Sequence, residues 1–117
     1  MAWTVEFRPS AENDIALIFD HLVQSHLDFG HDTASAISLA SGRINSIVQN
    51  RQRIAVAPER GGRILNNNHT YRHLTIERTI YWFTLDKVRQ IIQIEAIFHG
   101  GQDHLQHMLA RLTGKEP

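Results

Sequence analysis

The sequence predicts a single α+β domain over residues 1–117, in which a strand and a helical hairpin precede an antiparallel sheet and a last helix, in the order β-α-α-β-β-β-α. The chain is 42% hydrophobic and 21% charged, as is usual for one globular domain with a single core. Two stretches near the N-terminus repeat apolar residues at helical spacing, whereas three short runs in the last third alternate in polarity. A sheet with the helical hairpin packed on one face buries both patterns.

The first predicted elements are a strand and a helix. Residues 2–7 alternate in polarity, which predicts a strand. Ser10 is a suitable N-cap for a helix that runs to about His26. Glu12 and Asp14 are expected outside the apolar face, where they complement the positive end of the helix dipole. The apolar stripe of this helix is Ile15, Ile18, Phe19 and Leu22.

A second helix is predicted after the break at Gly30. Asp32 can cap it, and its pattern continues to about Arg51 or Arg53. A short glycine-containing turn between two helices predicts an antiparallel hairpin. Its apolar stripe is Ile37, Ala40, Ile44, Ile47 and Val48.

Residues 55–69 contain a proline, two glycines and three successive asparagines, which predict a loop. The loop lacks the Gly-Lys-Ser/Thr ending of a phosphate-binding P-loop. Three strands follow at about 70–76, 79–85 and 88–98, with Glu77-Arg78 and Asp86-Lys87 as hairpin turns.

The last predicted strand and helix carry the remaining apolar positions. Alternation in the strand predicts one buried and one partly wet sheet face. The buried face is expected to hold Ile92, Ile94, Ala96 and Phe98, opposite Gln93 and Glu95. A helix over about 102–112 is expected to direct inward Leu105, Met108, Leu109 and Leu112.

Charge is unevenly distributed, although the formal net charge is zero. Residues 1–32 hold one arginine against six acidic side chains, and residues 33–78 hold seven arginines against two glutamates. This basic middle predicts either internal ion pairs or a face for an acidic partner. The absence of cysteine excludes disulfides, thiolate metal sites and a cysteine nucleophile. No secretory signal or membrane span is recognisable, so we expect a cytoplasmic protein.

The order of elements and several short motifs resemble the RelE/ParE superfamily of toxins from bacterial type II toxin-antitoxin modules, in particular its ParE-like, plasmid-stabilisation branch. The resemblance runs over nearly the whole chain. Its motifs are Pro9-Ser10-Ala11, Pro58-Glu59-Arg60-Gly61-Gly62-Arg63, Tyr71-Arg72-His73-Leu74, Ile80-Tyr81-Trp82-Phe83 and His99-Gly100-Gly101-Gln102-Asp103-His104.

The resemblance implies a growth-inhibiting toxin that a cognate antitoxin neutralises, in a toxin-antitoxin hetero-oligomer. Members on the ParE side are associated with inhibition of DNA gyrase, and members on the RelE side cut messenger RNA in the ribosome. A third alternative is a degenerate toxin that retains antitoxin binding alone. The ParE-like, non-enzymatic reading is favoured because the usual nuclease residues are incomplete. Family nucleases commonly use lysines and a tyrosine near the C-terminus. Residues 33–86 contain no lysine, and no tyrosine follows Tyr81.

Candidate site residues follow from these alternatives. If the chain is a metal-independent endoribonuclease, the residues expected to hold phosphate or move protons are Arg72, His73, Arg78 and His99. The residues expected to bind antitoxin or target are Arg60, Arg63, Arg72, Trp82, His99, Gln102, Asp103 and His104. For Trp82 this expectation requires that one of three adjacent aromatics be exposed.

A metal site at the same end of the sheet is the weaker reading. Asp103 and His107 stand four residues apart on the predicted last helix, but this spacing matches no familiar zinc signature. We therefore predict no metal and no cofactor.

Overall fold

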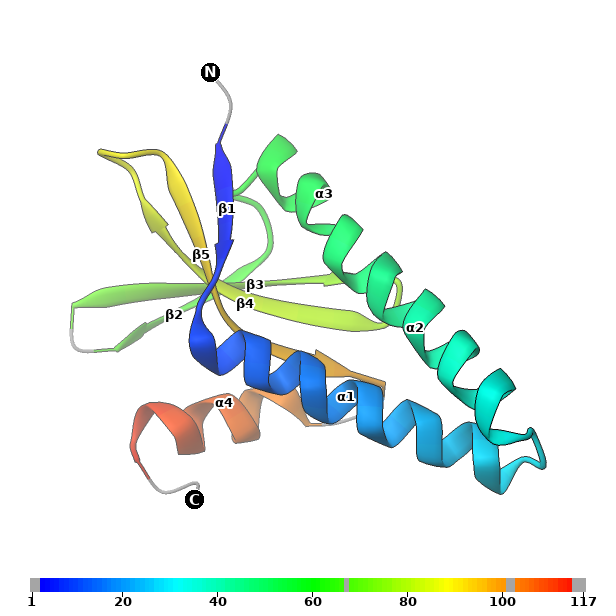
Figure 1. Cartoon of the computed structure of the whole chain (residues 1–117). Coiled ribbons are helices and arrows are strands. Elements are labelled where there is room, and N and C mark those ends of the chain that lie inside the picture. The colour runs from blue at the N-terminus through cyan, green and yellow to red at the C-terminus, as the bar shows by residue number, and fades with distance from the viewer. Residues whose placement is uncertain (1–2, 67, 101–102, 115–117) are drawn as a thin grey trace.

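The computed structural model describes residues 3–66, 68–100 and 103–114. It is an α+β fold built on a five-stranded sheet with the strand order β1-β5-β4-β3-β2 (Figure 1). The elements are β1 (Thr4–Phe7), α1 (Pro9–Asp28), α2 (Thr33–Gln49), α3 (Arg51–Val56), β2 (Gly62–Asn66), β3 (His69–Ile76), β4 (Thr79–Asp86), β5 (Ile91–His99) and α4 (His104–Leu112). The predicted fold class is confirmed.

The sheet is mixed, which corrects the expectation of a purely antiparallel one. β1 pairs in parallel with β5, from Thr4 opposite Ile91 to Phe7 opposite Ile94. A parallel neighbour needs a long crossover connection, and here the connection is most of the domain. The first strand of the chain therefore pairs with the last one, β5.

The predicted loop over 55–69 is wrong in part, because it contains the edge strand β2 and overlaps the end of α3. β2 pairs antiparallel with β3, from Gly62 opposite His73 to Asn66 opposite His69. Asn68, between β2 and β3, adopts φ 64°, a backbone conformation that asparagine tolerates in turns. Gly61 has φ 89°, and a Cβ there would collide with the carbonyl oxygen of His73. The asparagines and glycines thus mark the two ends of a strand.

The two long helices form the predicted antiparallel hairpin, and the Asp32 cap is confirmed. The Asp32 carboxylate accepts from the Ser35 amide at 2.7 Å, and this hydrogen bond lowers the pKa of Asp32. Ser10 is not the N-cap of α1, because Pro9 already occupies the first helical turn and Arg8 takes the cap position. The Ser10 hydroxyl instead donates to the Glu95 carbonyl oxygen at 2.6 Å.

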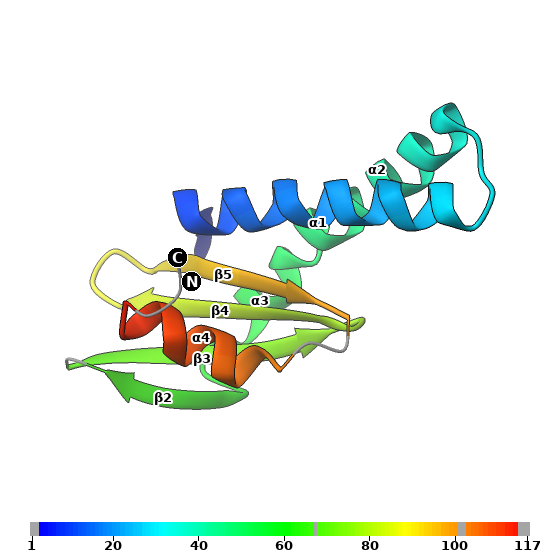
Figure 2. The same ribbon diagram turned by 90° about the horizontal axis from the view of Figure 1, so that it is seen from below.

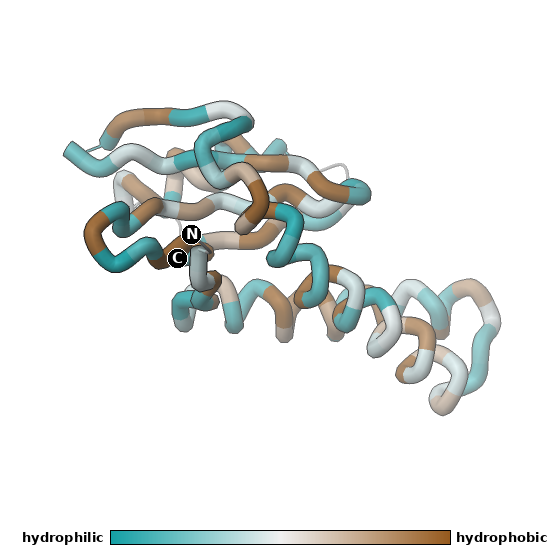
Figure 3. Tube along the Cα trace, turned by 90° about the horizontal axis from the view of Figure 1, so that it is seen from above, coloured by the Kyte–Doolittle hydropathy of each residue, from teal (hydrophilic) through white to brown (hydrophobic). Residues whose placement is uncertain are grey.

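The hairpin of α1 and α2 extends past the sheet, and its far end lies away from the strands (Figures 1 and 3). The predicted apolar stripe of α2 is correct in part, because Ala40 and Ile47 are buried, whereas Ile37 is 44% exposed. The neighbouring Ala36 is fully buried, so the buried face of α2 runs through Ala36 and Ala40 and leaves Ile37 at its side.

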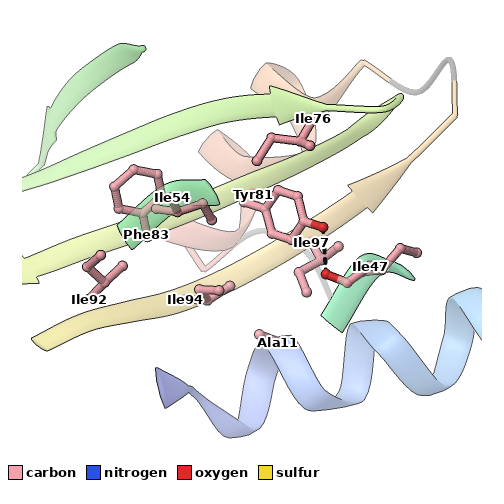
Figure 4. Close-up of a cluster of buried hydrophobic side chains, with 9 residues drawn as sticks. All are labelled: Ala11, Ile47, Ile54, Ile76, Tyr81, Phe83, Ile92, Ile94 and Ile97. Atoms are coloured by element: carbon pink, nitrogen blue, oxygen red, sulfur yellow. Dashed lines mark hydrogen bonds between the residues drawn. The ribbon is translucent and has the colours of Figure 1, made fainter. Parts of the chain in front are cut away.

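The main core lies between the sheet and the helices α1, α2 and α3 (Figure 4). Tyr81 and Phe83 of β4 contribute its largest side chains. The Tyr81 hydroxyl donates to the Ile47 carbonyl oxygen at 2.7 Å and so fixes α2 to the sheet. Burial, with a smaller contribution from Glu77, raises the pKa of Tyr81, which keeps this hydroxyl a donor. The buried members of this core are Ala11, Ile47, Ile54, Ile76, Tyr81, Phe83, Ile92, Ile94 and Ile97.

A second cluster on the opposite sheet face packs against α4, which lies on the other side of the sheet from α3 (Figure 2). A register shift between Trp82 and Phe83 leaves Glu95 as the extra residue of β5. Such a bulge reverses the alternation of the strand. The prediction that all four apolar residues of β5 share one face is therefore wrong: two join the main core, and two join the second cluster. That second cluster consists of Ile80, Trp82, Ala96, Phe98 and Met108.

Helix α4 covers only a narrow strip of the sheet. Met108 is buried and Leu112 packs against the second cluster, as predicted. Leu105 and Leu109 are 43% and 50% exposed, so the expectation that all four residues point inward is wrong. A short helix that contacts a sheet along one line buries one side of its stripe.

The two hairpin turns differ from each other. Glu77 and Arg78 form the predicted two-residue turn, and both adopt positive φ, at 51° and 68°. The second turn is longer than predicted, and β5 begins at Ile91. The Asp86 carboxylate accepts from the Arg89 amide at 3.0 Å and from its guanidinium at 2.7 Å, which closes a wider loop.

In the described part of the chain, no helix is both long and apolar enough to cross a membrane.

Candidate functional site

A cavity of about 660 Å³ lies beside the C-terminal half of β5, between α1 and α4. Its walls come from α1 near the N-terminus and from the consecutive elements β5 and α4 near the C-terminus (Figures 1 and 2). We call it the β5-edge groove, and its lining residues are Asp14, Leu17, Ile18, His21, Ile97, Phe98, His99, Gly100, His107 and Arg111.

Asp14 and Arg111 join α1 to α4 across this groove. Arg111 donates to the two carboxylate oxygens of Asp14 at 2.6 and 2.9 Å, and the Ile97 amide donates to the same carboxylate at 2.9 Å. Asp14 is 4% exposed, so the expectation that it lies outside the apolar face is wrong. The spacing from Ala11 through Asp14 to Ile18 places it on the buried stripe, and this was the signal in the sequence.

His99 stands at the end of β5 among cationic side chains. Its Nδ1 lies 2.9 Å from the Thr79 hydroxyl oxygen. Burial lowers the pKa of His99, and the nearby charges of Arg43, Arg78 and His21 lower it further. The predicted residues Arg78 and His99 therefore lie close together, and this end of the sheet attracts anions.

Phe98 forms the aromatic part of the groove. The His107 ring stacks on it with centroids 6.0 Å apart and an interplanar angle of 24°. The Arg111 guanidinium carbon lies 5.0 Å from the centre of the Phe98 ring. These contacts order both polar side chains against one apolar surface.

A separate histidine cluster lies under the start of α4, on the second sheet face. The Trp82 indole donates to His104 Nδ1 at 3.2 Å, and the His73 ring centroid lies 5.2 Å from that of His104. His73 also packs on Trp82 at 4.5 Å and leaves no room for a side chain at Gly62. Burial lowers the pKa of His73, and His104 contributes further.

The expectation of an exposed aromatic in the sequence Tyr81-Trp82-Phe83 is wrong, because all three side chains are 0% exposed. Helices cover both sheet faces at this point, which the alternation of one strand cannot reveal. Trp82 does not reach the surface, and it contacts His73 and His104.

The four nuclease candidates do not converge. Arg72 and His73 are neighbours on β3 and therefore lie on opposite sheet faces. In the sheet, His73 lies opposite Trp82 and His99 lies opposite Thr79. Trp82 and Thr79 are three residues apart on β4, so the two histidines are separated by about 10 Å along the strand. Arg78 lies in the turn beside His99. These residues do not form one acid-base centre.

Two of the predicted arginines of the middle segment, Arg60 and Arg72, donate to main-chain carbonyl groups in or near α3. Arg72 is 8% exposed and donates to the Glu59 carbonyl oxygen at 3.1 Å. Arg60 donates to the Arg53 carbonyl oxygen at 2.5 Å. Arg63 is exposed on β2, opposite Arg72. Arg63 thus presents its charge to solvent, whereas Arg72 does not.

The remaining predicted residues belong to the junction between β5 and α4. Asp103 is the N-cap of α4, where its carboxylate accepts from the Gln106 amide at 3.3 Å. Gln102 lies outside the described residues. Within residues 3–66, 68–100 and 103–114, no group of three His, Cys, Asp or Glu side chains is arranged to hold a metal ion.

The two shifted histidines predict a loss of stability in mild acid. An unfolded imidazole takes up its proton near the ordinary pKa of 6.5, whereas folded His73 and His99 resist protonation. Their contribution to stability is therefore complete above 6.5 and is lost as the pH falls from there toward the folded pKa values. Urea unfolding between about pH 7.5 and about pH 5.5 is expected to show this decline. It should flatten in a His73→Gln/His99→Gln variant; an unchanged slope would contradict the assignment.

The fold is shared with chains from two solved toxin-antitoxin complexes. A chain of the toxin-antitoxin complex RelBE2 from Mycobacterium tuberculosis superposes with a TM-score of 0.58 and 12% identity, covering 85% of this chain and 99% of that one. A chain of the chromosomal ParDE toxin-antitoxin system from P. aeruginosa superposes with a TM-score of 0.61 and 22% identity, covering 85% and 97%. No family model and no curated protein sequence matches. The chain therefore has the RelE/ParE-type fold.

Proposed function

We propose that this chain is the toxin of a type II toxin-antitoxin pair, and that it acts in the ParE-like manner by docking on a large target such as DNA gyrase. The observation that carries the proposal is the match over nearly the full length of chains from two toxin-antitoxin complexes. Fold alone does not decide an activity, so the choice between docking and catalysis depends on the site.

The site geometry favours docking over catalysis. RNA cleavage needs a base, an acid and phosphate-binding cations around one reacting group. Arg72 and His73 lie on opposite faces of the sheet, and His99 is separated from His73 by about 10 Å along β4. The β5-edge groove combines apolar and cationic side chains, which suits recognition of another protein.

Induced expression tests the proposal. Cells that express the chain alone are expected to stop growing, with plasmid supercoiling relaxed and messenger RNA intact. Co-expression of a cognate antitoxin, for which a small reading frame beside the toxin's own is the first candidate, is expected to restore growth. Growth arrest with cleaved messages would instead support the nuclease activity, and unimpaired growth would contradict a toxin.

One observation favours an endoribonuclease as the second candidate function. His73 and His104 lie side by side against Trp82, and His73 is held neutral, as a general base must be near neutral pH. If this alternative holds, a His73→Gln variant abolishes message cleavage, while a His31→Gln control at the exposed hairpin tip does not.

A further inference from the structure

Helix α4 is held on the second sheet face by a small apolar contact. Met108 is buried there, and Leu112 packs beside it in partly buried form. Leu105 and Leu109, on the same helix, are exposed. A surface element with so little buried apolar area has low local stability. Polar contacts therefore contribute much of what keeps α4 on the sheet.

Polar contacts hold both ends of this helix. At the C-terminal end, Arg111 donates to the buried Asp14 carboxylate. At the N-terminal end, the Trp82 indole donates to His104 Nδ1 at 3.2 Å. An indole N–H can only donate, so this Nδ1 carries no proton. Because Trp82 is fully buried, loss of its acceptor leaves a buried donor unsatisfied, which is costly.

A second imidazole depends on the same contact. The His73 ring lies beside that of His104, with centroids 5.2 Å apart, and it packs on Trp82 at 4.5 Å. Burial lowers the pKa of His73, and the neighbouring His104 lowers it further. Lifting α4 from the sheet exposes His73 to water and takes His104 away. Release of the helix therefore favours protonation of both histidines.

The surroundings of His104 give a proton little compensation. Asp103 is the one acidic neighbour among the described residues of α4 and its cap, and its carboxylate already accepts from the helix amide of Gln106. His104 is the first residue of the helix, where the positive end of the dipole disfavours a further positive charge. The titratable groups around it are His73 and Tyr71 on this face of β3, with Asp103 and His107 of the cap and the next turn of α4. The strands β2, β4 and β5 present to this cluster the apolar residues Ile64, Ile80, Trp82, Ala96 and Phe98.

We propose that α4 is an acid-released cap: a proton taken from solvent by His104 Nδ1 breaks the hydrogen bond with Trp82 and frees the N-terminal half of α4, while the rest of the domain stays folded. The released helix uncovers Trp82 and Phe98 on the second sheet face. A surface that is covered at neutral pH thus becomes exposed in mild acid. The inference goes beyond the proposed function and does not depend on it.

The direction of the pH dependence follows from which state binds the proton. The docked helix needs an unprotonated His104 and a neutral His73, whereas the released helix allows both to be charged. Docking is therefore complete above the range in which imidazoles take up protons, and it weakens as the pH falls through that range. Each linked proton changes the docking equilibrium by about tenfold per pH unit where it titrates.

The test is amide hydrogen exchange by NMR on the intact chain at about pH 7.5 and about pH 5.5, expressed as protection factors so that the intrinsic effect of pH is removed. The Met108 and Leu109 amides of α4 are expected to lose at least about tenfold in protection in acid. The amides of β4 are expected to lose less. The indole N–H signal of Trp82 is expected to shift, and a Trp3→Phe variant identifies which of the two indole signals it is.

Matched variants locate the proton. His104→Gln supplies an oxygen that can accept from the indole but does not titrate, so the protection of α4 is expected to be nearly independent of pH. His107→Gln is the control on the same helix, because the His107 ring stacks on Phe98 rather than on Trp82; it is expected to keep the response. His104→Phe can neither accept nor titrate. It is expected to lower protection at both pH values and to remove the response as well.

The outcomes separate a released helix from general unfolding. A loss of α4 protection that His104→Gln removes and His107→Gln retains supports the inference, whether or not the chain is toxic to cells. Unchanged protection of α4 in acid would overturn it. So would equal losses in α4 and β4, or a response that persists in both His104 variants.

Discussion

Replacing Asp14 with alanine is expected to destabilise the chain by about 2–4 kcal/mol. Loss of one partner from a buried ion pair leaves the other charge and its hydrogen bonds uncompensated. Here the substitution removes two acceptor contacts from Arg111 and the acceptor of the Ile97 amide. The lower part of the range applies because the Arg111 side chain is 30% exposed and solvent screens its charge. Urea unfolding at neutral pH measures the change.

Two further variants separate the ion pair from the amide contact. Asp14→Asn keeps an oxygen for the Ile97 amide, and a smaller loss of stability is therefore expected. In a double-mutant cycle with Arg111→Ala, the loss is expected to fall short of the sum of the single effects. Additive losses would show that Asp14 and Arg111 are not coupled.

Replacing Trp82 with alanine is expected to cost about 3–5 kcal/mol, as for other buried aromatic truncations. The Trp82 side chain is fully buried and forms the centre of the second cluster. Its loss leaves a cavity beneath α4 and removes the donor to His104. Since small domains are stable by about 5–15 kcal/mol, the variant is expected to be partly unfolded near body temperature. Thermal unfolding followed by far-ultraviolet circular dichroism measures this.

Trp82→Phe provides the matched comparison. It keeps most of the apolar contact and loses the hydrogen bond to His104, so a cost of about 1–2 kcal/mol is expected. If alanine and phenylalanine at this position cost the same, the packing of α4 on Trp82 would not be the stabilising contact.

The sequence predicts the elements whose patterns are local. The two long helices, the Asp32 cap and the Glu77-Arg78 turn each depend on residues close together in the chain, and the structure confirms them, although Ile37 of the predicted α2 stripe is exposed. β2 escapes the pattern because a short edge strand between glycines and asparagines has the composition of a loop.

The parts that sequence reasoning missed depend on contacts between distant residues. The bulge at Glu95 divides the apolar residues of β5 between two faces, and no periodicity within the strand shows it. Asp14 is buried because it faces the Ile97 amide and Arg111, which lie 83 and 97 residues later. An acidic residue in the first turns of a helix otherwise predicts a solvent-exposed partner of the dipole.

The sequence places a run of polar residues at the end of β5, and the β5-edge groove lies there, with His99 and Arg78 close together. A binding role for this end of the sheet stays a prediction. The apolar wall of Leu17 and Ile18 was not predicted, because on α1 these residues look like ordinary members of a core stripe. Trp82 and Arg72, which were expected at the surface, are buried.

If an antitoxin neutralises this chain as a toxin, growth after induced expression reveals it. Cells are expected to arrest when the chain is expressed alone, with relaxed plasmids and intact messages, and to recover when a cognate antitoxin is co-expressed. Normal growth of cells that accumulate the folded chain without that partner would contradict it.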